Sequence, residues 1–154
     1  MTHSQRFIFA LIATASFAAP CFALAADGAA KKIQDLTFDD IKFAIKKDAP
    51  FKRSMLTKKI EGLDEKKIRI RGYMLPSFQQ KGIKQFVLVR DNMQCCFGPG
   101  AALYDCILVE MDEGKSTSFT IRPISVEGTF EIKEFKGPDG KHLAVYHMVG
   151  QKVK

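Results

Sequence analysis

Two segments of the chain share a pattern that strongly restricts its fold: apolar residues at alternate positions, with a glycine within the apolar series. In residues 67–74, KIRIRGYM, the isoleucines, Gly72 and Met74 alternate with charged residues and a tyrosine. Residues 124–132, ISVEGTFEI, repeat this pattern around Gly128. A period of two predicts strands with one buried face, and a glycine inside a strand indicates a bulge or a sharp bend. Two such strands favour a sheet that curves until it closes.

Four shorter apolar segments are further strand candidates: KQFVLVR, CILVEM, SFTIR and HLAVYHMV. Turn residues separate most of them, as at Glu113-Gly114 and at residues 137–140, GPDG. Together the segments predict a mainly β domain, for which a small antiparallel Greek-key barrel of the oligonucleotide/oligosaccharide-binding (OB) type is the expected architecture. An open β-sandwich is the structural alternative.

One amphipathic helix is expected before the first long strand. Thr37 and Asp40 are spaced as a capping box, and apolar residues follow at helical spacing in TFDDIKFAIKKD. The pattern predicts a helix over residues 38–47, ended by Pro50.

The N-terminal residues have the organisation of a secretory signal peptide. Arg6 precedes an apolar run over residues 7–20, and Ala23-Leu24-Ala25 matches the small-x-small cleavage pattern. We therefore expect a signal peptide over residues 1–25, a short tether over 26–35, and a single domain over 36–154. The expected location is the periplasm or the extracellular medium, with no membrane span after cleavage.

The formal net charge is +7. The excess lysines fit a solvated surface, and they lack the clustered arginines and interleaved aromatics typical of nucleic-acid-binding proteins. No nucleic acid is therefore expected as a partner. A barrel face that binds polyanions or oligosaccharides through Arg69, Arg71 and Lys84 is one alternative function. No catalytic constellation is present, which favours a non-enzymatic protein.

The segment DNMQCCFGPGAALYDC, residues 91–106, holds the three cysteines outside the leader: Cys95, Cys96 and Cys106. Thiols in an oxidising compartment are normally paired or bound, and three cysteines cannot all pair within one chain. One interpretation is a structural disulfide from Cys106 to Cys95 or Cys96. Closing so short a loop stabilises a protein by roughly 3 kcal/mol in the loop-entropy model.

A second interpretation of the same segment is a soft-metal site. Thiolates, alone or with histidine, are ligands that zinc and copper(I) prefer. The turn at residues 98–100 could bring Cys106 to the vicinal pair, and His147 could complete the ligand set. His142 is five residues away, on the opposite face of the predicted strand, so at most one histidine joins the site.

A third interpretation is thiol-disulfide redox chemistry, for which Arg90 and the amides of the turn are the nearest groups that could stabilise a thiolate. Aromatic side chains near the segment could also form a ligand or partner surface. Asp91 and Asp105 bracket the segment and could assist a metal or form an ion pair with Arg90. The candidate surface comprises Tyr73, Arg90, Asp91, Phe97, Tyr104 and Asp105.

Three stretches of the chain resemble a known family: KIRIRGYMLPSF, IKQFVLVRDNMQCCFGPGAALYDCILVEM and ISVEGTFEI. They are similar to exported bacterial proteins of the domain-of-unknown-function family 3299, over about Leu36 to Val149. Many relatives carry Cys-x-His followed by prolines in this loop. Here Cys96 falls at the cysteine, whereas Gly98 stands in the histidine's place, so Cys95 and Cys106 would have to supply replacement ligands. Some similar proteins are associated with zinc uptake, which implies a role in metal homeostasis beside a periplasmic metal-transport system.

Overall fold

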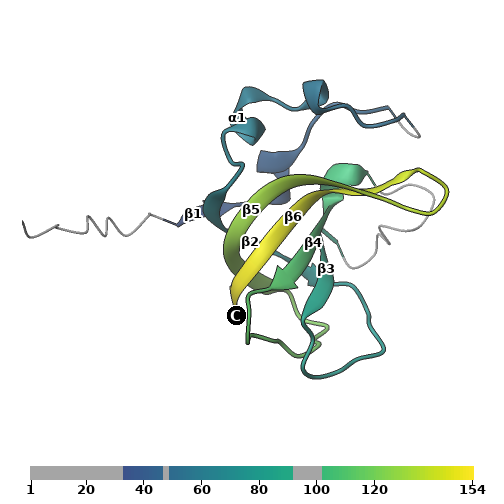
Figure 1. The fold of residues 1–154 in the computed structure, drawn as a ribbon. Helices are drawn as coiled ribbons and strands as arrows, with labels where there is room; N and C mark the ends of the chain where they lie inside the picture. The colour runs from purple at the N-terminus through teal and green to yellow at the C-terminus, as the bar shows by residue number, and fades with distance from the viewer. Residues whose placement is uncertain (1–32, 47–48, 92–101) are drawn as a thin grey trace, which may run out of the picture. The chain divides into compact units, whose positions relative to one another are not determined.

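The computed structural model describes residues 33–46, 49–91 and 102–154, which form a mainly β unit (Figure 1). The strands are β1 (Gln34–Leu36), β2 (Lys66–Met74), β3 (Gln85–Val89), β4 (Cys106–Met111), β5 (Ile124–Lys136) and β6 (His142–Val153). The helical elements are short: α1 (Lys58–Glu61) and the 3-10 turns η1 (Phe38–Ile41), η2 (Arg53–Met55) and η3 (Leu103–Asp105). No helix in these three ranges is long and apolar enough to cross a membrane.

All six strands belong to one sheet, and its pairings return to their starting strand. β2 pairs with β3, β3 with β4, β4 with β6, β6 with β5, and β5 again with β2, while β1 adds to β2. The expectation of a wholly antiparallel sheet is wrong, because β1 pairs with β2 and β4 with β6 in parallel. The reason for the second parallel pair is connectivity: β5 reverses the chain and β6 reverses it again before β6 meets β4. Figure 1 shows β5 and β6 running side by side.

The two glycine-containing segments form β2 and β5, and they pair with each other. Ile68 lies opposite Gly128, and Gly72 lies opposite Ile124. A Cβ atom on Gly72 would lie 2.6 Å from the carbonyl oxygen of Val89, and one on Gly128 would lie 2.2 Å from that of Val149. Both glycines are therefore required because a neighbouring strand passes too close for any side chain. The two predicted strands and their buried faces are confirmed, and a register irregularity lies beside Gly128, as predicted. Gly72 pairs regularly with Ile124, so the bend expected there is replaced by a close strand approach. The strand expected at SFTIR, residues 118–122, is wrong: these residues belong to the β4–β5 loop.

The chain before β2 covers the core with apolar side chains instead of with the predicted helix. The expected helix over residues 38–47 is wrong: only η1 forms, and Lys42 already has extended backbone angles, φ −74° and ψ 136°. Ile41 and Phe43 are both buried, with exposed residues between and after them. A helix would turn these two side chains about 200° apart, whereas an extended chain places both on the core. Gln34 and Asp35, expected in the tether, belong to β1.

Tyr146 connects this covering segment to the sheet. Its hydroxyl donates a 2.7 Å hydrogen bond to the carbonyl oxygen of Ile41. In the predicted helix, the same carbonyl would have accepted a backbone hydrogen bond instead. The ring packs against Phe43 and Phe130. Burial raises the pKa of the Tyr146 phenol, which favours the protonated hydroxyl that donates this bond.

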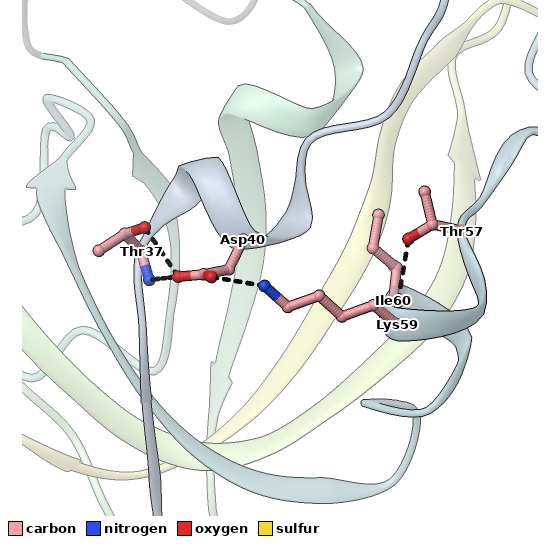
Figure 2. A network of polar contacts seen from close by, with 5 residues as sticks. All are labelled: Thr37, Asp40, Thr57, Lys59 and Ile60. Atoms are coloured by element: carbon pink, nitrogen blue, oxygen red, sulfur yellow. Dashed lines mark hydrogen bonds and ion pairs between the residues drawn. The ribbon is translucent and has the colours of Figure 1, made fainter.

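Asp40 joins η1 to α1, as Figure 2 shows. Its carboxylate accepts hydrogen bonds from the backbone nitrogen and hydroxyl of Thr37, at 2.9 and 2.8 Å, and from Lys59 Nζ at 2.7 Å. The Lys59 bond, followed by the two Thr37 bonds, lowers the pKa of Asp40 to about 2. Thr57 caps α1 by accepting a 3.3 Å bond from the nitrogen of Ile60.

The Asp40 network predicts an acid-sensitive part of the stability. Because the folded pKa of about 2 lies below the ordinary value of 3.8, the contribution is fully present above about pH 4 and is lost as the pH falls toward 2. Urea unfolding of the wild type and of Asp40→Asn should differ at pH 7 and converge near pH 2. Glu113→Gln, which removes an exposed carboxylate of the β4–β5 loop, is the control. A constant difference across this range would contradict the prediction.

The close approach at Gly128 predicts a large effect of one methyl group. Gly128→Ala should lower the free energy of unfolding by about 3 kcal/mol, because the Val149 backbone cannot move without disturbing β6. Gly62→Ala is the matched control, since Gly62 has an ordinary φ of −69° and its nearest contact is 3.3 Å away. Urea denaturation of the two variants checks this, and equal midpoints would show that β5 and β6 separate more easily than the structure indicates.

Candidate functional site

Cys106 is the one predicted metal or disulfide cysteine within the described residues; Cys95, Cys96 and Phe97 lie outside them. Cys106 begins β4, its side chain is buried, and it forms no disulfide within the described residues. Its Sγ lies 3.6 Å from the carbonyl oxygen of Leu143 and 3.8 Å from that of Leu103. The predicted metal site and disulfide both need Cys95 or Cys96, so both stay predictions.

The chain on either side of the cysteine loop, residues 92–101, is fixed by a short hydrogen-bonded ladder. Val89 lies opposite Cys106 in the β3–β4 pair. One step further, the nitrogen of Arg90 donates a 3.0 Å hydrogen bond to the carbonyl oxygen of Asp105. We refer to Val89, Arg90, Asp105 and Cys106 as the loop base. The loop base holds the start and the end of the cysteine loop side by side.

Ion pairs strengthen the loop base. Arg90 lies 2.6 Å from Asp39 Oδ1 and 3.6 Å from Asp105 Oδ1. The hydrogen bond with Asp39 is the main cause of a raised Arg90 pKa. The predicted ion pair between Arg90 and Asp105 is confirmed, and Arg90 also ties η1 to the loop base. Asp91 is half-buried at the edge of the described residues.

His147, the histidine predicted as a metal ligand, is buried between two carboxylates. Its Nδ1 lies 2.9 Å from Glu131 Oε2 on β5, and its Nε2 lies 3.5 Å from Glu110 Oε2 on β4. The imidazole is 5% exposed, whereas the Glu110 side chain is 61% exposed. Residues of three strands therefore contact the ring, and Glu110 is the more exposed of its two carboxylate neighbours, since Glu131 is 34% exposed.

Strand register places His147 on the same face of the sheet as Cys106. His147 lies opposite Leu108 of β4. Leu108 is two residues after Cys106, so the two side chains leave β4 on the same side, while the intervening Ile107 points into the main core. The cysteine and the histidine thus occupy neighbouring positions of one surface.

The two histidines have different surroundings. His142 Nε2 lies 2.8 Å from Glu134 Oε2, and its ring packs edge-on against Phe51 of the main core. His147 instead packs against Phe135. Only His147 shares a face with Cys106 through the β4–β6 register.

A small apolar cluster surrounds Cys106, separate from the main core. It comprises Val89, Cys106 and Ala144, with Tyr73, Leu75, Val87 and Phe135 partly buried against it. Tyr73, predicted for a ligand surface, therefore lies in the cluster around Cys106. Tyr104, predicted for the same surface, packs edge-on against Phe43 of the main core instead, and Lys42 lies over its ring.

Sequence reasoning missed the two glutamates beside His147. Glu131 was visible only as a polar residue of an alternating strand, and Glu110 only as an acid near a strand end. Within residues 33–46, 49–91 and 102–154, no group of three or more ligand side chains could hold a metal ion. The predicted ligands Cys95 and Cys96 lie outside these ranges.

The histidine geometry predicts unequal roles for the two glutamates. Glu131→Ala should lower the free energy of unfolding by about 1–2 kcal/mol, because it leaves a buried ring nitrogen without its hydrogen bond. Glu110→Ala should cost less than about 0.5 kcal/mol, since the contact is longer and solvated. Urea denaturation of both variants at pH 8 tests this, and an equal cost would mean that Glu131 does not fix the ring.

Comparison with known proteins supports a family assignment. The family described as "Protein of unknown function (DUF3299)" matches residues 23–154. The fold is similar to the crystal structure of a DUF3299 family protein from Pseudomonas aeruginosa PAO1, with a TM-score of 0.56 and 18% identity, covering 80% of this chain and 95% of that chain. No curated protein matches. The chain belongs to the DUF3299 family, as its sequence motifs predicted.

Proposed function

We propose that the protein is a non-enzymatic binding module of the periplasm or the extracellular medium whose cysteine loop binds zinc or copper. Cys95, Cys96 and Cys106 supply thiolates and His147 supplies an imidazole. One observation carries this proposal: a buried histidine, oriented by a carboxylate, shares a face with the buried thiol at the end of the cysteine loop.

The contact between His147 and Glu131 is the arrangement that metal-binding histidines commonly use. A carboxylate that accepts the Nδ1 proton fixes the tautomer and leaves the Nε2 lone pair for a metal ion. Here Glu131 lies 2.9 Å from Nδ1. Glu110, exposed and 3.5 Å from Nε2, can turn toward solvent or share the ion. The bulk of the site would then consist of soft sulfur ligands, which suit zinc and copper(I).

The loop base supports the participation of all three cysteines. Cys95 follows Val89 by six residues, and a chain of this length reaches up to roughly 20 Å. Because Val89 lies opposite Cys106, the loop is long enough to return either vicinal cysteine to Cys106. The same geometry permits the alternative in which Cys106 forms a structural disulfide with Cys95 or Cys96.

We further propose that the sheet is a small OB-like Greek-key barrel. The support is the sequence of pairings from β2 through β3, β4, β6 and β5 back to β2. The absence of side chains at Gly72 and Gly128, where strands approach closely, also supports it. Barrels of this type bind ligands over one sheet face and its adjoining loops, and β3 and β4 carry both the apolar cluster and the cysteine loop.

The other functions receive less support from the geometry. Redox catalysis needs an exposed, activated thiolate, whereas Cys106 is buried and Arg90 is paired with Asp39. The polyanion-binding alternative includes Arg69 among its ligand-binding residues. Arg69 instead forms ion pairs with Asp35 at 2.8 Å and with Glu127 at 3.0 Å. The resemblance to proteins associated with zinc uptake makes a periplasmic metal-transport system the proposed partner.

Metal content and thiol count, measured on the same sample, test the metal proposal. Protein purified from the periplasm without reductant or chelator should contain close to one equivalent of zinc or copper and no disulfide. Cys95→Ser/Cys96→Ser and His147→Asn should lower the affinity for zinc by at least about tenfold.

His142→Asn is the matched control, because it removes the histidine outside the proposed site and should leave the affinity unchanged. One free thiol, no metal and a mass two hydrogens below the reduced value would establish the structural disulfide and refute the metal site.

A further inference from the structure

Two exposed hydrophobic side chains occupy the end of the sheet opposite the cysteine loop. Phe78, in the β2–β3 loop (residues 75–84), is fully exposed, and Ile121, in the β4–β5 loop (residues 112–123), is 80% exposed. β3 begins and β4 ends at these loops, whereas the cysteine loop joins their other ends. Both loops lie at the lower edge of Figure 1. Neither loop contains a residue of the proposed metal site.

Hydrogen bonds hold the two loops against each other. Ile83 and Thr117 exchange two backbone bonds of 2.9 Å, and the nitrogen of Phe119 donates a 3.0 Å bond to the carbonyl oxygen of Gln80. Phe78 lies two residues before Gln80, and Ile121 lies two residues after Phe119. Because Ile83 and Thr117 form an antiparallel bridge, both steps lead along the joined loops in the same direction, away from that bridge.

The β2–β3 loop also has internal support beside Phe78. The Gln79 side chain donates to the carbonyl oxygens of Lys81 and Gly82, at 3.0 and 3.1 Å, and its backbone nitrogen donates to Ser77 Oγ at 3.2 Å. The loop therefore has a defined shape although Phe78 packs on nothing. A single exposed apolar residue needs no explanation, but two at one end of a fixed loop pair do.

Cationic residues outnumber acidic ones in the two loops that carry the apolar side chains: Lys81, Lys84, Lys115 and Arg122 stand against Asp112 and the exposed Glu113. Lys81, Lys84 and Arg122 are exposed, and residues 75–84 contain no acid. In the other loop, Asp112 is paired with Lys115 at 3.2 Å, which also lowers the Asp112 pKa. Three exposed cations and two exposed apolar side chains thus belong to the two loops at this end of the sheet.

We propose that this end of the protein binds the surface of an anionic lipid bilayer, with Phe78 and Ile121 inserted among the headgroups. Aromatic and aliphatic tips with flanking cations are the combination that gives reversible binding at a bilayer interface. A stable protein interface buries about 800 Å² on each side around an apolar core, whereas here serine, glutamine and threonine separate the apolar residues. A second copy of the chain would place like charges against each other.

Co-sedimentation with vesicles tests the proposal on the mature chain, residues 26–154. Binding to vesicles of phosphatidylglycerol and phosphatidylethanolamine should exceed binding to phosphatidylcholine vesicles, and should fall as salt is raised. Phe78→Ser/Ile121→Ser should weaken binding about tenfold or more. Lys81→Gln/Lys84→Gln/Arg122→Gln should weaken it roughly fivefold for each cation removed.

Matched controls separate this surface from general effects. Leu143→Ser changes an apolar side chain that is 39% exposed on another strand, and Lys46→Gln/Lys52→Gln/Lys58→Gln removes the same charge from the segment before β2. Both controls should bind as the wild type does, and urea midpoints should show that all variants fold. Equal binding to neutral vesicles, equal loss in the controls, or a loop-dependent dimer without vesicle binding would overturn the proposal.

Discussion

The structure depends on the close passage of neighbouring strands over Gly72 and Gly128. At Gly128 the carbonyl oxygen of Val149 lies 2.2 Å from where a side chain would begin, so β6 can follow β5 over its whole length only because that position is empty. β5 in turn pairs with β2, so the succession of pairings that starts at β2 returns to it. The site depends on the same contact: β6 carries His147 against Glu131 of β5 and beside β4, where Cys106 begins the strand. If β6 were displaced, the His147 imidazole would move away from both Glu131 and Cys106.

Periodicity predicted the strands β2 to β6 and the buried faces of β2 and β5, because side-chain alternation and burial agree there. It failed at SFTIR, residues 118–122, which lie in a loop, and it did not indicate β1. It failed before β2, where IKFAIK satisfies a helical spacing and an alternating one equally well, and the core selected the extended form through Ile41 and Phe43. The parallel β4–β6 pair and the glutamates beside His147 depend on register. Irregularities in the β5–β6 pair shift the position of β6. The one between Glu127 and Gly128 is marked by the glycine, whereas the one between Ile132 and Phe135 has no such glycine. The ion pair of Arg90 with Asp105 could be predicted from the sequence because both residues adjoin one loop. The ion pair of Arg90 with Asp39 could not, because these residues are 51 positions apart.

The two proposals assign different chemistry to the two ends of β3 and β4. One end carries the loop base, with a buried thiol and a nearby oriented imidazole; the other carries two apolar tips and three exposed cations. At about 3.3 Å per residue, strands of five and six residues separate these ends by roughly 15–20 Å. A molecule bound to a bilayer by its loop tips would therefore hold the cysteine loop clear of the headgroups. In that orientation a metal ion remains accessible to a partner at the membrane surface.

X-ray absorption at the metal edge of the loaded protein tests the central claim most directly, because it reports the ligand atoms themselves. The account predicts sulfur neighbours at about 2.3 Å together with one imidazole nitrogen at about 2.0 Å. It also predicts that the imidazole signal disappears in His147→Asn while the sulfur signal remains. A shell of oxygen and nitrogen alone, or a spectrum unchanged by that substitution, would contradict the assignment of Cys106 and His147 to one site.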